Sequence, residues 1–183
     1  MQIKNKLILL SLFILNLFVF NSNIHAEEFN ISAEEISIDK ENDIVTGKGS
    51  IEVTDSDGKL IKADKVKYEK SKKLILAEGS VEFFDAEGNI LKTNKITYDK
   101  IKNLIVTYNN SEVILKEGYK IKAKKILYNN AEKIISSSDN SVLTDLDGNL
   151  VSVDMFQYHL ESNLFSSIGN IKIVDANKNK YFF

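Results

Sequence analysis

A period of 30 residues, kept without insertion from about residue 30 to the C-terminus, constrains the fold more than any other feature of the chain. Two series of identical residues mark it: Gly58, Gly88, Gly118 and Gly148, and Tyr68, Tyr98, Tyr128 and Tyr158. Two further series keep the residue type: Gly49, Gly79, Asn109, Asp139 and Gly169, which tolerate positive φ, and the apolar Ile36, Val66, Ile96, Ile126 and Phe156. Four series at one spacing indicate a chain built from stacked structural repeats.

Each repeat contains two segments with the pattern of a half-buried strand. Residues 61–68 and 74–83 alternate apolar and polar side chains, and β-branched and aromatic residues occupy the apolar positions. No helical periodicity persists for three turns beyond residue 26. We therefore predict an all-β fold of five repeats, which begin near Asn30, Lys59, Asn89, Tyr119 and Asn149.

The connections carry turn sequences. Asp55–Gly58, Asp85–Gly88 and Asp145–Gly148 are predicted hairpin turns with glycine at a positive-φ position. The other connections, such as Glu69–Lys73, are short and charged. Each repeat is therefore expected to be an antiparallel pair of strands.

The alternation slips by one residue inside the first strand of a repeat. Ile61 and Ala63 share a parity, whereas Val66 and Tyr68 have the opposite one, which would turn the later side chains to the other face. A bulge or corner between Ala63 and Val66 restores the inward face. A bend in every repeat predicts a bent antiparallel β-jelly-roll, or semi-open β-sandwich, built from stacked repeats.

Energetics require the repeats to stack. About six inward apolar side chains contribute roughly 10–15 kcal/mol for one repeat, whereas ordering its backbone costs roughly 30–60 kcal/mol. A single repeat therefore cannot fold alone, but neighbouring repeats can share one core.

The composition argues against an enzyme. Cysteine is absent, every basic residue is lysine, and the only histidines are His25 and His159. These absences exclude disulfides, thiolate chemistry, arginine clamps and most metal sites, so we expect no catalytic residues, no bound metal and no cofactor. The Asp-x-Asp-Gly turns also offer too few oxygen ligands for calcium.

Two lysine clusters, at 70–73 and 122–125, are the main basic features of a chain whose net charge is −2. Nucleic-acid binding normally requires a basic domain, so we expect no nucleic-acid partner. Solubility and protection of strand edges are the predicted roles of these lysines. Contact with a phosphorylated lipid head group is the alternative.

Residues 1–26 have the layout of a secretory signal peptide. Lys4 and Lys6 precede an apolar run over residues 7–20, and a polar stretch then ends at Ala26. We predict cleavage after Ala26, export to a periplasm and a mature repeat domain over 27–183; an uncleaved anchor is the alternative. Residues 180–183 match the opening of a sixth repeat, which suggests either a strand that pairs with a partner or the front part of a longer protein.

The half-repeats at 63–68 and 77–83 resemble those of the OstA-like family. That family comprises periplasmic lipopolysaccharide-transport proteins and the N-terminal domain of the outer-membrane lipopolysaccharide-assembly protein. The resemblance covers about residues 30–179. In the later repeats Asn94 and Lys124 stand where the earlier repeat has the acid Asp64. Asn109 and Asp139 stand where it has Gly79.

The resemblance implies a periplasmic groove that shelters the acyl chains of lipopolysaccharide and stacks end to end with similar proteins through strand addition. The N-terminal domain of the assembly protein, with its outer-membrane barrel missing from this chain, is one alternative. A secreted structural β-solenoid without a ligand is another. From parity alone, we predict that these residues face the interior and line the lipid groove: Ile36, Ile38, Val66, Tyr68, Val81, Phe83, Ile96, Tyr98, Val113, Ile126, Tyr128 and Phe156.

Overall fold

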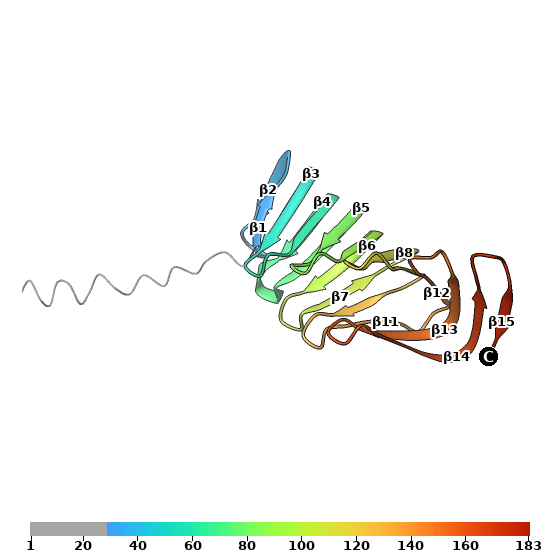
Figure 1. Ribbon diagram of the computed structural model, residues 1–183. Coiled ribbons are helices and arrows are strands. Elements are labelled where there is room, and N and C mark those ends of the chain that lie inside the picture. Colours follow the sequence, from blue (N-terminus) through green and yellow to red (C-terminus); the bar gives the residue numbers. More distant parts are fainter. Residues whose placement is uncertain (1–28) are drawn as a thin grey trace, which may run out of the picture.

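The computed structural model describes residues 29–183, which form antiparallel strands and one short 3-10 helix, η1 (Lys70–Lys72) (Figure 1). The predicted signal peptide lies outside the described residues. The all-β expectation is confirmed. The strands are β1 (Phe29–Ser32), β2 (Glu35–Asp39), β3 (Ile44–Asp55), β4 (Leu60–Glu69), β5 (Leu74–Phe84), β6 (Ile90–Asp99), β7 (Leu104–Thr107), β8 (Ser111–Ile114), β9 (Lys120–Ala123), β10 (Leu127–Asn129), β11 (Ile134–Ser137), β12 (Ser141–Thr144), β13 (Leu150–His159), β14 (Leu164–Val174) and β15 (Lys180–Phe182).

Long strands bend in the middle, so that each contributes to two sheets that face each other (Figure 1). Sheet 1 contains the strand halves next to the glycine turns, and sheet 2 contains the other halves. The order in sheet 1 is β1-β3-β4-β5-β6-β8-β9-β12-β13-β14-β15. The order in sheet 2 is β2-β3-β4-β5-β6-β7-β10-β11-β13-β14.

The predicted slip of register occurs at the bend. The pairing of β4 with β5 shifts between Lys62 and Lys65, and the exposed residues 64–65 separate the buried Ala63 and Val66. At this corner the side chain of Asp64 lies directly over Gly79, where a Cβ atom would collide with it. Glu34 lies over Gly49 and Asp154 over Gly169 in the same way. An acid packed on a glycine therefore forms the corner in the outer repeats.

The corner has a different structure in the central repeats, because both the acid and the glycine are replaced there, by Asn94 with Asn109 and by Lys124 with Asp139. Here the bent strands are interrupted, and β7 with β8, and β11 with β12, take the place of single strands. Buried hydroxyl groups bond the interrupted backbone: Thr107 Oγ1 accepts from Ile126 N at 2.8 Å, and Ser137 Oγ donates to the carbonyl of Lys125 at 2.7 Å. Ser111 Oγ donates to Thr107 Oγ1 at 2.6 Å. Hydroxyl groups thus satisfy backbone groups that a continuous strand would pair.

The predicted hairpin turns are confirmed. In the first, Gly58 N donates to Asp55 O at 3.3 Å, and Gly58 has φ +80°. The Asp55 carboxylate also accepts hydrogen bonds from the backbone N–H groups of Asp57 and Lys59. The turns at Asp85 and Asp145 repeat this arrangement. The aspartate is therefore a local cap for its own turn.

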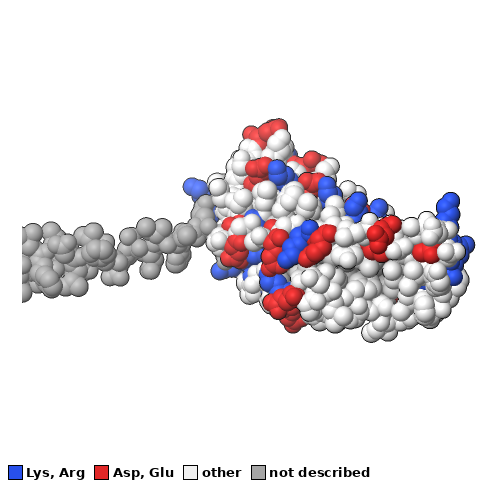
Figure 2. Space-filling view, viewed as in Figure 1, with Lys and Arg blue, Asp and Glu red and all other residues white. Residues whose placement is uncertain are grey.

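The outer faces of the two sheets differ in charge. Across sheet 1, Lys62–Glu52, Lys92–Glu82 and Lys122–Glu112 form ion pairs at 2.9, 2.6 and 3.4 Å. On sheet 2 the outward positions become uncharged toward the C-terminus, and Figure 2 shows few charged side chains over β11, β13 and β14. Within residues 29–183, no helix has the length and apolarity needed to cross a membrane.

Candidate functional site

The apolar interior between the two sheets is the candidate site. It forms one continuous cluster from Phe29 to Leu160. Ten of the twelve residues predicted to face inward are buried here, each at most 7% exposed: Val66, Tyr68, Val81, Phe83, Ile96, Tyr98, Val113, Ile126, Tyr128 and Phe156. Their inward orientation follows the predicted parity, and their contact with lipid stays a prediction.

Ile36 and Ile38 are exceptions, because they are 50% and 60% exposed rather than enclosed. They pair with Gly47 and Val45 of β3, and Val45 is buried, so both point to the inner face. However, β2 is the terminal strand of sheet 2 among the described residues, where its only strand partner is β3. The parity was right, but parity does not determine whether a neighbour covers the side chain.

Parity reasoning also missed part of the interior. Two further sets of buried residues repeat at the 30-residue spacing: Ile61, Leu91 and Ile121 in sheet 1, and Ile75, Ile105 and Ile135 in sheet 2. Each set is apolar throughout. Extending every apolar position by 30 residues would have found them.

Aromatic side chains connect the two sheets inside this cluster. Phe29 of sheet 1 contacts Tyr68 and Tyr98 of sheet 2, with ring centroids 5.0 and 5.8 Å apart. Phe83 then contacts Tyr98 and Tyr128 at 6.3 and 6.0 Å. All four pairs are edge-to-face, an arrangement that ring quadrupoles favour. The tyrosine series therefore belongs to the packing between the sheets.

On the side opposite the corners, the glycine turns of sheet 1 approach the connections of sheet 2, and we call this side of the interior the mouth. At Asp55, polar side chains bond the two sheets across the mouth. Tyr98 Oη donates to Asp55 Oδ2 at 3.0 Å, and the Lys100 and Lys59 ammonium groups lie 2.8 and 3.4 Å from the same oxygen. Asp57 pairs with both lysines. We call Asp55, Asp57, Lys59, Tyr98 and Lys100 the first closure.

The first closure is a buried charge network. The Asp55 side chain is 1% exposed, and the Lys59 and Lys100 side chains are 5% and 10% exposed. Burial raises the pKa of Asp55, but hydrogen bonds from Lys100, Lys59 and Tyr98 outweigh it and hold the pKa below its usual value. The Lys100 and Lys59 ammonium groups likewise lower the pKa of Asp57. Both carboxylates are therefore ionised at neutral pH, which compensates the buried lysines.

One repeat later, a second closure keeps the aspartate, as Asp85, but has asparagines, Asn89 and Asn130, in place of the two lysines. Tyr128 Oη donates to Asp85 Oδ2 at 2.7 Å, and Asn89 Nδ2 donates to the same oxygen at 2.7 Å. Asn130 stands where the first closure has Lys100. Burial, and then the Asp85 carboxylate, raise the pKa of Tyr128 well above its usual value, so its hydroxyl remains a donor. A single ion pair, Lys133–Glu87 at 2.6 Å, lies beside it.

The equivalent set one repeat further along, Leu115, Tyr158 and Leu160, contains no acid, and we call it the third closure. Leu115 replaces Asp55 and Leu160 replaces Lys100, and both leucines are buried. Tyr158 Oη donates instead to Asn163 within its own connection, at 3.2 Å. The mouth therefore changes from charged to apolar along the stack.

The inner face becomes accessible at the C-terminal end of the stack. Phe165 stacks on Phe156 at 5.5 Å but is only partly buried, as are Ile171 and Ile173. Tyr181 pairs with Ile173 in the last strand of sheet 1 and is 46% exposed. An apolar surface thus runs from the enclosed interior to an open end, as it does near Ile38 at the other end.

The partly exposed residues at the two ends of this arrangement offer apolar contact surface. Among residues 29–183, no three acidic or histidine side chains are grouped so that they could hold a metal ion. The serine at position 137 bonds a backbone carbonyl, as described above, and so has a structural role. Burial of an apolar ligand on such a surface would contribute about 0.8 kcal/mol for each methylene.

Comparisons with known proteins point to one family. The family profile described as "LptA/(LptD N-terminal domain) LPS transport protein" matches residues 30–164. No curated protein sequence matches the chain. Among solved structures, LptH, the LptA homologous periplasmic component of the lipopolysaccharide transport device from Pseudomonas aeruginosa, is 12% identical, with 85% of this chain and 93% of that one covered and a TM-score of 0.31. The TCP10 domain of Danio rerio CPAP, in complex with a STIL peptide, is 11% identical, with coverages of 84% and 97% and a TM-score of 0.18.

Proposed function

Because the chain belongs to the LptA/LptD N-terminal domain family of lipopolysaccharide transport proteins, we propose that it carries lipopolysaccharide through the periplasm with the acyl chains held against the inner faces of its two sheets. The observation that carries this proposal is the continuous apolar interior, which opens at Ile36 and Ile38 on one side and at Phe165 and Tyr181 on the other. A fully enclosed core would offer an acyl chain no point of entry.

The end strands support transfer between proteins. β15 pairs with β14 on one side, and no described strand pairs with its other side; β2 is likewise the last strand of sheet 2. Unpaired strand edges accept another chain by β-augmentation. Addition of a similar protein at either end would extend both sheets, and the apolar inner face would continue into the partner.

Site-specific photo-crosslinking tests the lipid contact. A photoreactive phenylalanine analogue replaces Phe165, which faces inward, in one variant and Leu164, which is 55% exposed on the outer face, in the other. The two positions are adjacent and apolar, so unspecific adsorption would label both. Lipopolysaccharide labelled at Phe165 and not at Leu164 is the expected result.

The same experiment tests the alternative of a structural β-solenoid. A structural β-solenoid without ligand would give no crosslink at Phe165 in a folded protein. Equal labelling at Phe165 and Leu164 would place the lipid on the surface rather than on the inner face. Either outcome would contradict the proposed function.

A further inference from the structure

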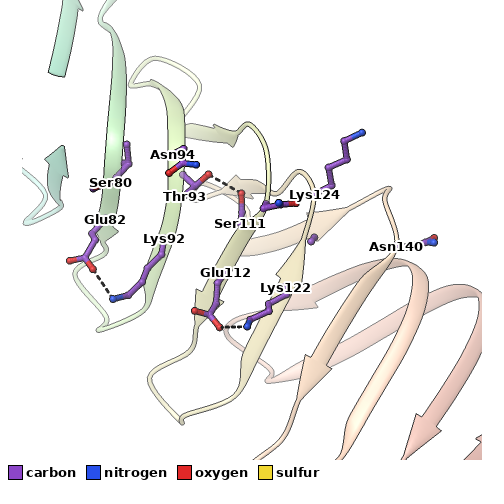
Figure 3. A pocket seen from close by; sticks show the side chains of 13 residues that line it. Ser80, Glu82, Lys92, Thr93, Asn94, Ser111, Glu112, Lys122, Lys124 and Asn140 are labelled. Atoms are coloured by element: carbon purple, nitrogen blue, oxygen red, sulfur yellow. Dashed lines mark hydrogen bonds and ion pairs between the residues drawn. The ribbon is translucent and has the colours of Figure 1, made fainter. Parts of the chain in front are cut away.

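A hollow lies at the central corners, beside the outer face of sheet 1. Most of its lining residues are polar, and Val81 and Ala123 of the apolar cluster also line it. Its volume is about 720 Å³, which is within the range of about 300–1,000 Å³ typical of small-molecule sites. Figure 3 shows its side chains across β5, β6, β8 and β9, with the ion pairs Glu82–Lys92 and Glu112–Lys122 drawn along one side. A space of this size with a polar lining suits a hydrophilic ligand.

The hollow coincides with the repeats that depart from the acid-on-glycine corner. Two of the three outer corner acids form hydrogen bonds within the protein: Glu34 accepts from Ser50 Oγ at 2.7 Å, and Asp154 accepts from Asn170 N at 2.9 Å. The central repeats replace these acids with Asn94 and Lys124, and both replacements line the hollow.

Four exposed polar side chains of the lining have no hydrogen-bond or ion-pair partner among residues 29–183 and are therefore available to a ligand: Asn94, Asn110, Lys124 and Asn140. Three are amides, each with two N–H donors and a carbonyl acceptor. The fourth is an ammonium group, a point charge suited to phosphate. Lys92 and Lys122 are already paired with glutamates, so Lys124 leaves the lining with one uncompensated positive charge.

We propose that this hollow binds a phosphorylated sugar, with the amides of Asn94, Asn110 and Asn140 bonding the hydroxyl groups and Lys124 bonding the phosphate. Amide groups can donate to and accept from a hydroxyl at once, which a neutral sugar requires. The ammonium group adds a charge-assisted bond that only an anionic ligand can use. The hollow borders the apolar interior through Val81 and Ala123, and a hydrophilic ligand there goes beyond lipid transport.

Titration by NMR or calorimetry with soluble ligands tests the proposal, since a ligand without acyl chains cannot use the interior. The probes are glucose 6-phosphate, glucose and inorganic phosphate. We expect saturable binding of glucose 6-phosphate, and at least tenfold weaker binding of the other two. Equal affinity for inorganic phosphate would show an anion site without sugar recognition and would overturn the proposal, as would the absence of saturable binding.

Two variants locate the binding. Lys124→Gln removes the charge at an exposed position and should weaken glucose 6-phosphate binding at least tenfold. Lys62→Gln, in the ion pair with Glu52 outside the hollow, is the matched control and should leave the affinity unchanged. The double substitution Asn94→Asp/Asn109→Gly recreates the outer corner and should abolish binding. Unchanged affinity in Lys124→Gln or in the double variant would contradict the assigned residues.

Deacylated lipopolysaccharide saccharide, used as a fourth probe, identifies the source of the sugar. Competition with glucose 6-phosphate at lower concentration would assign the hollow to the head group of the proposed cargo. Weaker or equal competition would assign it to a free sugar phosphate. Both results support the phosphorylated-sugar site, and neither depends on lipid transport being correct.

Discussion

The first and third closures occupy equivalent places in the repeat but use opposite chemistry. Asp55, Lys100 and Tyr98 form a buried ionic network, whereas the equivalent Leu115 and Leu160 are apolar and Tyr158 bonds within its own connection. A buried charge network is rigid only while every member has its partner. Apolar side chains tolerate rearrangement because their contacts are not directional. The comparison suggests that the mouth is fixed near the N-terminal repeats and easier to open near the C-terminal ones.

Removal of the central carboxylate should have the largest effect. Asp55→Ala leaves the Lys59 and Lys100 ammonium groups with only Asp57, and it leaves the Tyr98 hydroxyl and two turn N–H groups without their acceptor. We expect the free energy of unfolding to fall by about 3–5 kcal/mol, the usual cost of breaking a buried ion pair. Urea denaturation measures it.

Asp145→Ala is the matched control, because Asp145 caps an equivalent turn but contacts no tyrosine or lysine among the described residues. Loss of the turn hydrogen bonds alone should cost about 1 kcal/mol. Equal losses for Asp55→Ala and Asp145→Ala would show that the closure contributes nothing beyond the turn.

Glycine substitution separates a crowded position from an open one at similar φ. Gly79 has φ +79° and lies under the Asp64 side chain, whereas Gly148 has φ +84° and no atom within 4 Å of an added Cβ. Gly148→Ala should therefore cost only the left-handed backbone penalty, about 1–2 kcal/mol. Gly79→Ala adds the collision and should cost about 2–4 kcal/mol. Thermal denaturation of both variants checks the difference, and equal costs would mean that the corner shifts freely.

The sequence predicted the elements whose pattern repeats locally. Alternation with a period of two identified the strands, the parity slip beside Ala63 identified the corner, and glycine at fixed spacing identified the turns. It did not predict the closures. Tyr98 and Asp55 are 43 residues apart, so their contact depends on how far one sheet is offset across the other, which no pattern within a repeat records.

The lining of the interior was predicted in orientation but not in exposure. Ile38 has the correct parity and nevertheless is exposed, because burial depends on a neighbouring strand, and none within residues 29–183 lies beyond β2. The 30-residue period describes an interior repeat and says nothing of the ends. The proposed function therefore depends on two places that the period does not describe, beside Ile38 and beside Phe165.

Deletion of single hydroxyl groups should distinguish the second closure from the third. Tyr128→Phe removes a 2.7 Å hydrogen bond to a buried carboxylate and should cost about 1.5–3 kcal/mol, the range for bonds to charged groups. Tyr158→Phe removes a 3.2 Å bond to a neutral amide and should cost about 0.5–1 kcal/mol. Urea denaturation of the two variants measures both losses. A larger loss for Tyr158→Phe would contradict the expectation that the tyrosine hydroxyl stabilises the second closure more than the third.

Acid should weaken the first closure in particular, because the pKa of Asp57 is lowered by the Lys100 and Lys59 ammonium groups. A carboxylate with a lowered folded-state pKa stabilises the protein above its unfolded pKa, near 4, and this stabilisation is lost as the pH falls through the folded value. Since the Asp57 side chain is half exposed, solvent screening keeps the effect below about 1 kcal/mol. Unfolding by urea at pH 6, 4 and 3 measures it.

Asp57→Asn should therefore reduce the loss of stability between pH 5 and pH 3, because the variant has no proton to bind at this position. Asp147→Asn, at the equivalent place in the fourth glycine turn with the same Asp-x-Asp-Gly sequence, is the control, since Asp147 forms no ion pair within residues 29–183. It should leave the pH dependence closer to that of the unsubstituted protein. If both variants flatten the profile equally, the acid sensitivity comes from the turns in general, and the contrast between a charged and an apolar mouth loses its main electrostatic consequence.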